Sequence, residues 1–490
     1  MSTTTLRHIV AASGVQFGTS GARGLVASMS DAVCHAYAQA FLRAVASASG
    51  TVVLGHDLRP SSPAIAAACA RAVRDAGKEL VFVGALPTPA IAYYAALRAA
   101  PAIVVTGSHI PFDRNGIKFY RADGEISKQD EQAMLDAEVD APDAAVSAAA
   151  AAAPALPAAP AEPAQAYLQR YLDMFGAAAL AGMRIAVYEH SSVAREILSG
   201  ILEALGATVL PLGRTDEFVP IDTEAVRAED IERAARWAQE HRFDAIVSTD
   251  GDADRPLIGD EAGRWLRGDI VGILCSQYLG ADAVVTPVSS NTAVERCGSF
   301  KDVIRTRIGS PYVIAGMEQA AARHGQGAVV AGYEANGGFL LGSDIARNGA
   351  VLKALPTRDA VLPIVAVLGL ARERACRVSE VAQALPPRFT ASDRLQDFAT
   401  DASRALIAHL AQDAAAAAAL LAPQSGALAH VDTTDGLRVS FAGGDIVHLR
   451  PSGNAPELRC YAEAATQVAA EALCQACLGR IAAGARQPGA

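Results

Sequence analysis

A short acidic segment, Asp250-Gly-Asp252-Ala-Asp254-Arg255, places three carboxylates at alternate positions. It follows residues 245–248, an apolar run of the length of a buried strand. Oxygen ligands without histidine or thiolate among them suit a small, hard divalent cation, and Mg²⁺ fits best. An EF-hand calcium loop also begins with alternating aspartates, but here Pro256 interrupts that pattern. A solvated acidic turn is the other alternative, although three close carboxylates repel one another unless a cation neutralises them.

A serine and a histidine lie in Thr106-Gly-Ser108-His109-Ile-Pro111, directly after the apolar run 102–105. In open α/β sheets, ligands bind beyond the carboxyl ends of the strands. Ser108 is therefore placed to act as a nucleophile or a phosphoryl carrier. An ordinary turn and a Ser-His-Asp hydrolase are the alternatives, but the G-x-S-x-G elbow of the α/β-hydrolases is missing.

The segment Gly332-Tyr-Glu334-Ala-Asn336-Gly-Gly338 also follows an apolar run, at residues 328–331. Glu334 and Asn336 are two residues apart and can hydrogen-bond two vicinal hydroxyl groups of a sugar. Glycines allow the backbone to approach a ligand closely. A tight turn explains the same residues equally well.

A fourth segment, Arg450-Pro-Ser452-Gly453-Asn454-Ala-Pro456-Glu-Leu-Arg459, is dense in groups that bind anions. Guanidinium, hydroxyl, amide and loop N–H groups suit a dianionic phosphate. A surface turn after a hairpin is the alternative. Together the four segments supply a carrier serine, a cation, a polyol site and a phosphate clamp, which are the parts that phosphoryl transfer needs.

The elements that must position these segments follow a repeated pattern of strands and Ala-rich helices. Expected strands lie at 51–54, 80–83, 102–105, 184–188, 208–210, 245–248, 283–286, 303–304 and 328–331, and an expected helix at 62–77. After about residue 374 the pattern changes to a hairpin at 437–449 and a final helix from about 465. The fold class predicted is three similar α/β domains with mixed sheets, then a smaller α+β domain, around a central cleft.

The domain limits predicted are 1–140, 165–265, 266–374 and 375–490, with a linker at 141–164. The linker is nearly all Ala and Pro, and Pro154, Pro157, Pro160 and Pro163 argue against a regular helix there.

Composition narrows the function classes. The net charge of −10 over 490 residues disfavours nucleic-acid binding through the overall field. No apolar run approaches the length of a membrane span and no secretory signal is recognisable, so a cytoplasmic protein is expected. Eight scattered cysteines indicate reduced thiols, and Cys474 and Cys477 are expected to be packing residues rather than zinc ligands.

The chain resembles the α-D-phosphohexomutases over nearly its full length. A motif near the start, Phe17-Gly-Thr-Ser-Gly-Ala-Arg23-Gly, precedes the serine, metal, sugar and phosphate segments in the family's order. Within the family the chain is most similar to the bacterial phosphomannomutases. The resemblance implies exchange between mannose 6-phosphate and mannose 1-phosphate through a phosphoserine enzyme and a hexose 1,6-bisphosphate, by a monomer or homodimer that binds small hexose phosphates.

The resemblance also implies roles for single residues. Phosphorylated Ser108 binds Mg²⁺ together with Asp250, Asp252 and Asp254. Near the reacting oxygens it implies Arg23 and Lys118, with Lys118 or His109 as general acid or base. For the substrate it implies a set of binding residues: Arg255, Gly309, Tyr312, Glu334, Asn336, Arg450, Ser452, Gly453, Asn454 and Arg459.

Three positions depart from the family pattern. Ile110 stands where Asn is frequent, Gly338 where the sugar segment commonly has His, and Asn454-Ala where Thr-Glu is usual. The departure at Gly338 removes a ligand-binding His from the sugar segment, so phosphoglucomutase and phosphoglucosamine mutase activities stay open, and a sugar phosphatase is a further alternative.

The variant Arg450→Ala is expected to raise the KM for the hexose phosphate more than it lowers kcat, because it removes a bidentate grip on phosphate. Steady-state kinetics would check this, and an unchanged KM would mean that the phosphate binds elsewhere.

Overall fold

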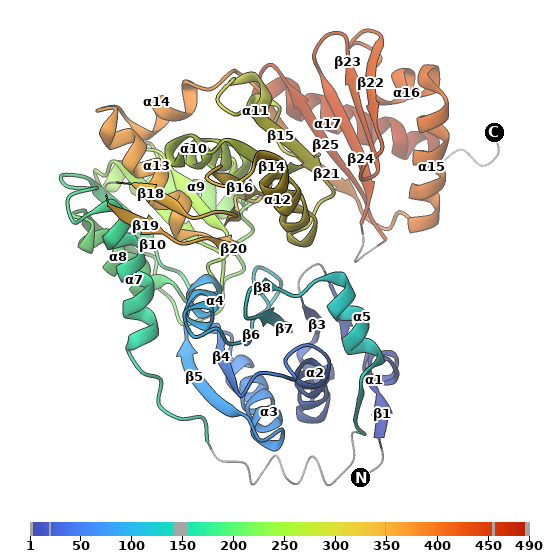
Figure 1. Ribbon diagram of the computed structural model, residues 1–490. Helices are drawn as coiled ribbons and strands as arrows, with labels where there is room; N and C mark the ends of the chain where they lie inside the picture. The colour runs from blue at the N-terminus through green and yellow to red at the C-terminus, as the bar shows by residue number, and fades with distance from the viewer. Residues whose placement is uncertain (1–2, 19–20, 142–154, 348, 453–455, 486–490) are drawn as a thin grey trace. The chain divides into compact units, whose positions relative to one another are not determined.

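The computed structural model describes residues 3–18, 21–141, 155–347, 349–452 and 456–485 (Figure 1). The chain forms two compact units. The first comprises Met1–Asp282 and Gly309–Ala382, and the second comprises Ala283–Ile308 and Gln383–Ala490.

The largest sheet of the first unit has the strand order β2-β3-β7-β6-β4-β5, with β8 beside β7. Its strands are β2 (Gln16–Phe17), β3 (Ala22–Leu25), β4 (Thr51–His56), β5 (Glu79–Ala85), β6 (Ala102–Val105), β7 (Arg114–Arg121) and β8 (Gly124–Glu125). Strand β4 runs parallel to β5 and β6, whereas β7 is antiparallel to β6. The three strands predicted in this region are confirmed, and the sheet is mixed.

Helices cover both faces of this sheet. Val52 and Leu54 of β4 lie in the core with α2 (Asp31–Ala44) and α3 (Ser62–Asp75), while Val53 lies in the core with α4 (Thr88–Leu97). Successive strand residues point to opposite faces, so an apolar run such as this one requires a layer on each side. The predicted helix at 62–77 is confirmed and ends slightly earlier, before a glycine in the left-handed region.

Two further sheets belong to the first unit. Strands β11 (Thr208–Leu212), β10 (Arg184–Tyr188), β12 (Ala245–Thr249) and β13 (Pro256–Gly259) pair in that order, with β13 antiparallel to β12. Strands β16 (Val330–Tyr333), β17 (Phe339–Leu341) and β20 (Leu355–Asp359) pair antiparallel. The strand predicted at 328–331 begins two residues later, at Val330. Gly325 and Gly327 have positive φ, so the backbone before the strand is not extended.

The remaining strand pairs of this unit are β1 (Thr3–Thr5) with β9 (Glu138–Asp140) and β18 (Ile345–Arg347) with β19 (Ala350–Leu352). The other helices are α1 (Leu6–Ser13), η1 (Val26–Ser28), α5 (Lys128–Asp136), α7 (Glu162–Phe175), α8 (Arg195–Ala204), α9 (Ala228–Glu240), α10 (Gly268–Leu279), α12 (Ser310–His324), α13 (Val361–Glu373) and α14 (Val378–Gln383).

The predicted linker is partly corrected. Residues 142–154 lie outside the described residues, and residues 155–161 form no helix, as predicted. Helix α7 nevertheless begins at Glu162, so the last three linker residues are helical. Pro163 is compatible with this because the first turn of a helix needs no N–H donor.

The second unit contains the parallel pair β14 (Ala283–Pro287) and β15 (Asp302–Thr306), with α11 (Ala293–Arg296) between them in sequence. Its main sheet is antiparallel in the order β21 (Phe389–Leu395), β25 (Leu458–Ala464), β24 (Ile446–Pro451), β23 (Leu437–Phe441) and β22 (Leu428–Asp432). Three helices complete it: α15 (Thr400–Gln412), α16 (Ala414–Leu421) and α17 (Gln467–Ala485). The predicted hairpin and final helix are confirmed.

The main sheet of the second unit has one apolar and one polar face. Cys460, Cys474 and Cys477 are free, buried thiols in the core between the sheet and its helices, so the prediction of packing cysteines is confirmed for the last two. On the other face, His448 of β24 stacks on Tyr461 of β25, and its Nε2 contacts the carbonyl oxygen of Asp435.

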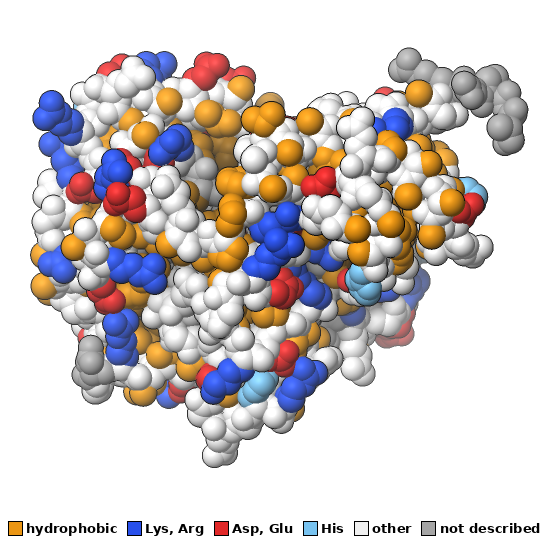
Figure 2. All heavy atoms as spheres, turned by 90° about the horizontal axis from the view of Figure 1, so that it is seen from above, with side chains coloured by type: hydrophobic (Ala, Val, Ile, Leu, Met, Phe, Trp, Pro, Cys, Tyr) orange, Lys and Arg blue, Asp and Glu red, His pale blue; other side chains and the backbone are white. Residues whose placement is uncertain are grey.

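Charged side chains are interspersed among apolar and uncharged atoms on the face seen in Figure 2. Among the described residues, no helix combines the length and the apolar character that crossing a membrane requires.

His448 makes the stability of the second unit depend on pH. Burial lowers its pKa from the ordinary 6.5 to about 4. As the pH falls, the unfolded chain therefore binds a proton at His448 before the folded chain does. The contribution of His448 to the free energy of unfolding is fully present above pH 6.5. It is lost as the pH falls towards 4, by up to about 3 kcal/mol. In urea unfolding at pH 7 and pH 5, His448→Phe is expected to lose less stability than the wild type. The exposed His430→Asn variant is the control, and an equal loss in all three proteins would contradict the assignment.

Candidate active site

Ser108 lies in the connection between β6 and β7 and is almost completely buried, with 1% of its surface exposed. Its backbone has a φ of +54°, a region that non-glycine residues rarely adopt. Its N–H donates to Thr106 Oγ1 at 2.8 Å, and its hydroxyl donates to Asp250 Oδ2 at 2.6 Å. The Nδ1 atom of His109 lies 3.3 Å from the same hydroxyl. The serine is thus held between a carboxylate and an imidazole.

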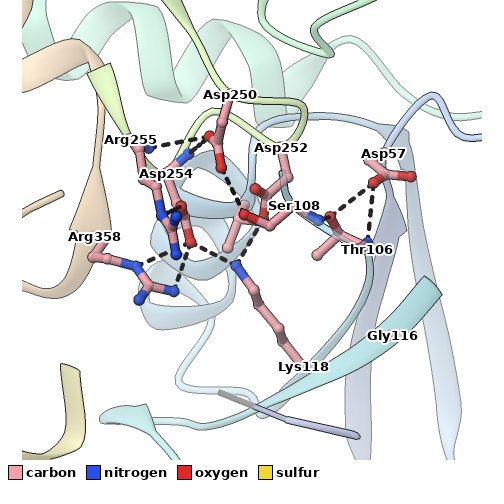
Figure 3. Close-up of polar contacts among 12 residues, drawn as sticks. Asp57, Thr106, Ser108, Gly116, Lys118, Asp250, Asp252, Asp254, Arg255 and Arg358 are labelled. Carbon is pink, nitrogen blue, oxygen red and sulfur yellow. Dashed lines mark hydrogen bonds and ion pairs between the residues drawn. The ribbon is translucent and has the colours of Figure 1, made fainter. Parts of the chain in front are cut away.

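The three aspartates follow β12 and are buried (Figure 3). One oxygen from each of Asp250, Asp252 and Asp254 lies within 4.8 Å of the others. Ala253 adopts a φ of +59°, which bends the chain between two of the carboxylates. The loop therefore concentrates three acidic groups beside the serine hydroxyl.

Two buried cations face these carboxylates (Figure 3). Lys118 Nζ, from β7, donates to Asp252 Oδ2 at 2.7 Å and to Asp254 Oδ2 at 2.6 Å. Arg358, from β20, donates to Asp254 Oδ2 through Nε and Nη2 at 3.1 and 2.8 Å, and its Nη1 donates to Glu334 at 3.0 Å. Residues from three sheets thus meet at one loop.

The charges move the pKa values in opposite directions. Burial, and then the charges of Asp252 and Asp254, raise the pKa of Asp250 well above its usual range. Burial also opposes ionisation of Asp254, but Arg358, Lys118 and Arg255 outweigh it and lower its pKa. Although burial disfavours the Lys118 cation, the two carboxylates raise its pKa. The cations of the site therefore stabilise the charge of Asp254, but they do not outweigh burial and carboxylate repulsion at Asp250.

The donor set fits a hard cation. Asp252 Oδ1 and Asp254 Oδ1 are buried and accept no hydrogen bond from any residue that the structure describes, although Arg255 Nε lies 3.6 Å from the latter. Buried carboxylate oxygens are ordinarily paired with donors or metal ions. Carboxylate oxygens without thiolate or imidazole suit Mg²⁺, Ca²⁺ or Mn²⁺. The acidic triad can therefore hold a metal ion.

A group of arginines beside the triad favours an anion. Burial, with repulsion from Arg255 and Arg358, lowers the pKa of Arg23 to about 10. Such an accumulation of guanidinium groups is stabilised by a bound phosphate. Burial also lowers the pKa of His109, so its imidazole is neutral at pH 7.

Models of the four domains of one family match most of the chain. They are described as phosphoglucomutase/phosphomannomutase α/β/α domains I, II and III, at residues 14–145, 146–263 and 267–389, and as the C-terminal domain, at 395–479. Phosphomannomutases from Salmonella muenchen and from Sinorhizobium fredii (strain NBRC 101917 / NGR234) are similar to the chain. They are 47% identical over 461 residues (94% of each chain) and 46% identical over 465 residues (94% of this chain, 97% of the relative).

The chain belongs to the phosphoglucomutase/phosphomannomutase family. It is therefore an isomerase, a phosphohexomutase. The solved structure of a phosphoglucomutase/phosphomannomutase family protein from Burkholderia thailandensis has a similar fold. Its TM-score is 0.72 at 20% identity, covering 96% of this chain and 98% of that one. The predicted fold class, three α/β domains with mixed sheets and then an α+β domain, is confirmed.

The structure of this phosphohexomutase brings most of the predicted first-unit residues together around Asp254. Glu334 is linked to the triad through Arg358, while the Asn336 Oδ1 atom accepts from the Gly338 N–H at 2.9 Å. Gly309, with a φ of +131°, immediately precedes α12, and Tyr312 is 38% exposed on its first turn. Contact of Gly309 and Tyr312 with a ligand stays a prediction.

The predicted phosphate segment lies in the second unit. Arg450 of β24 and Arg459 of β25 are directly opposite each other, so two guanidinium groups share one face of the sheet. The Oδ2 atom of Asp435 lies 3.0 Å from Arg450 Nε, and Ser452 is buried. Gly453 and Asn454 lie outside the described residues. These two neighbouring arginines can bind a phosphate group.

Sequence reasoning missed Arg358, Asp57 and Arg59. Arg358 stands 104 positions from Asp254, and no motif marks it. Asp57 accepts from Thr106 Oγ1 at 2.7 Å and from the Gly107 N–H at 3.3 Å. The segment Asp57-Leu-Arg59 directly follows β4, whose parallel neighbour β6 ends three residues before the serine. Because the ends of these two neighbouring parallel strands lie close together, the expected strands could have pointed to Asp57 and Arg59.

A calorimetric titration with Mg²⁺ tests the metal site. Asp252→Asn is expected to weaken binding at least tenfold, or about 1.4 kcal/mol, because it removes the charge of one ligand. Asp401→Asn, at a carboxylate that is 96% exposed, is the control. Equal Mg²⁺ affinity of wild type and Asp252→Asn would place the ion elsewhere.

Proposed function

We propose that this phosphohexomutase interconverts mannose 6-phosphate and mannose 1-phosphate, with Ser108 as its covalent phosphoryl carrier. The observation that carries the proposal is the 2.6 Å contact between the Ser108 hydroxyl and Asp250 in a triad able to hold a metal. The choice of mannose rests on the similarity to two phosphomannomutases over 94% of the chain.

Asp250, Asp252 and Asp254, with phosphorylated Ser108, would hold Mg²⁺. When bound, this ion would neutralise charge on the transferring phosphoryl group. The buried Oδ1 atoms of Asp252 and Asp254, to which no described residue donates a hydrogen bond, support this arrangement.

In the first half-reaction, the bond between Ser108 Oγ and phosphorus breaks, and a bond from phosphorus to a hydroxyl oxygen of the hexose phosphate forms. The hydroxyl proton passes to the neutral imidazole of His109, which lies 3.3 Å from Ser108 Oγ and would return a proton to that oxygen, while the Lys118 cation stays protonated between Asp252 and Asp254. The product is a hexose 1,6-bisphosphate. In the second half, the bisphosphate turns around and returns its other phosphoryl group to Ser108. The sugar oxygen regains a proton, so the net change is the position of one phosphate.

The arginines and the polar loops have separate tasks in this scheme. Arg23 and Arg255 would bind the phosphoryl oxygens, which agrees with the lowered pKa of Arg23. Glu334 and Asn336 would bind sugar hydroxyls, with Arg358 holding the Glu334 carboxylate. Arg450, Ser452, Gly453, Asn454 and Arg459 would bind the phosphate that does not react.

Activity with several sugars tests the proposal. Mannose 1-phosphate, glucose 1-phosphate and glucosamine 1-phosphate would be compared with Mg²⁺ and a trace of hexose 1,6-bisphosphate, while free phosphate is monitored. The highest kcat/KM is expected for mannose 1-phosphate, without phosphate release. A preference for another sugar would correct the substrate, and phosphate release without isomer formation would indicate a phosphatase.

Ser108→Ala is expected to lower kcat at least about 1,000-fold while the sugar phosphate still binds, because the variant removes the phosphoryl acceptor. Ser47→Ala, at an exposed serine of the same domain, is the control. Turnover near the wild-type value would exclude Ser108 as the carrier.

A further inference from the structure

We infer that Arg59 is a positioning residue for phosphoryl transfer, because its guanidinium group holds the Ser108 loop in its reactive conformation. Arg59 is 1% exposed, and two of its nitrogens donate to four backbone carbonyls. Nη2 donates to the carbonyls of Ser108 and Ile110 at 2.9 and 2.6 Å, and Nη1 to those of Pro111 and Arg114 at 2.8 and 2.9 Å. One side chain thus determines the path of the loop from residue 108 to residue 114.

The guanidinium group also lies close to Gly107 and to the ring of Phe218. A Cβ atom added at Gly107 would lie only 2.5 Å from Arg59 Cζ, so glycine is required there. The ring centroid of Phe218 lies 4.0 Å from the same Cζ atom. A planar cation can pack against backbone and an aromatic ring while its edge donates hydrogen bonds, and lysine cannot reproduce this geometry.

Asp57 pairs with the Nε atom of Arg59. Its Oδ2 lies 3.3 Å from Arg59 Nε and accepts from Thr106 Oγ1, the group that in turn accepts from the Ser108 N–H. Its Oδ1 accepts from the Ser62 hydroxyl and from the Arg59 N–H. The backbone N–H and the carbonyl of Ser108 are therefore both fixed by this buried ion pair.

This arrangement explains how Ser108 remains in an unfavourable backbone conformation. A non-glycine residue in a sparsely populated region costs about 1–3 kcal/mol, and it persists where surrounding groups hold it. The Ser108 carbonyl oxygen also lies next to the loop of residues 250–254, because a Cβ atom added at Gly251 would be only 2.8 Å from that oxygen. Arg59 therefore sets the distance between the serine loop and the loop that carries Asp250.

The inference rests on the proposed role of Ser108, and the rate of Ser108 phosphorylation tests it. Wild type, Arg59→Lys and Arg71→Lys would each be mixed with Mg²⁺ and glucose 1,6-bisphosphate, and phosphate on Ser108 would be followed by mass spectrometry. Arg71 is a buried arginine of α3 whose Nη1 lies 4.0 Å from Asp31, so its lysine variant is the matched control.

Arg59→Lys is expected to slow Ser108 phosphorylation and to lower kcat at least about 30-fold, with KM within about twofold, since the loop rather than the sugar site is disturbed. Amide hydrogen exchange at residues 109–114 is expected to rise in Arg59→Lys but not in Arg71→Lys. Phosphorylation and exchange at wild-type rates in Arg59→Lys would overturn the inference.

The variant Phe218→Leu keeps Arg59 and removes the aromatic ring that packs on its guanidinium group, so it serves if Arg59→Lys does not fold. It is expected to lower kcat about threefold to tenfold with KM unchanged, and a wild-type kcat would count against the inference. Absence of phosphate on Ser108 in the wild type would instead refute the carrier proposal, which separates the two failures.

Discussion

The structure of the site depends on the repulsion among three buried carboxylates. Asp250, Asp252 and Asp254 approach within 4.8 Å of one another, where interactions between charges are strong because water is largely excluded. Lys118 and Arg358 neutralise the part of the loop around Asp252 and Asp254, while Asp250 accepts a hydrogen bond from the Ser108 hydroxyl. Removing one partner from such a network costs about 3–5 kcal/mol, so each cation is constrained by the others. The loop can therefore hold a positive ion next to the serine.

Three sheets bring these groups together although they are far apart in sequence. Strands β6, β12 and β20 are short and buried, and each delivers a polar residue at or next to its end. Their apolar cores supply the rigidity, since close-packed interiors deform little. The same logic extends behind the serine, where Asp57 and Arg59 at the end of β4 hold the loop that β6 begins. The position of Ser108 is therefore fixed by residues at the ends of two neighbouring parallel strands, β4 and β6.

Much of this could be predicted from the sequence. Local patterns located the strands around 51–54, 102–105 and 245–248 and the hairpin at 437–449, because apolar runs and turn residues act over short distances. The alternating aspartates marked residues 250–254 for the same reason, and the structure brings their carboxylates together. Arg358 and the Arg59–Phe218 pair could not be found in this way, since their partners are distant in sequence and hydrogen bonds to backbone carbonyls leave no pattern of residue types. The start of α7 was missed because the preceding prolines argue for irregular structure, whereas Pro163 falls in the one turn that tolerates it.

The central claim is that Ser108 carries the phosphoryl group between two positions of one sugar. The most direct measurement is the mass of the peptide containing Ser108 after the enzyme is incubated first with hexose 1,6-bisphosphate and then with excess mannose 6-phosphate. This peptide is expected to gain one phosphoryl group in the first step and to transfer it to the sugar in the second, at a rate no slower than turnover. Turnover of mannose phosphates by an enzyme whose Ser108 never gains phosphate would contradict it.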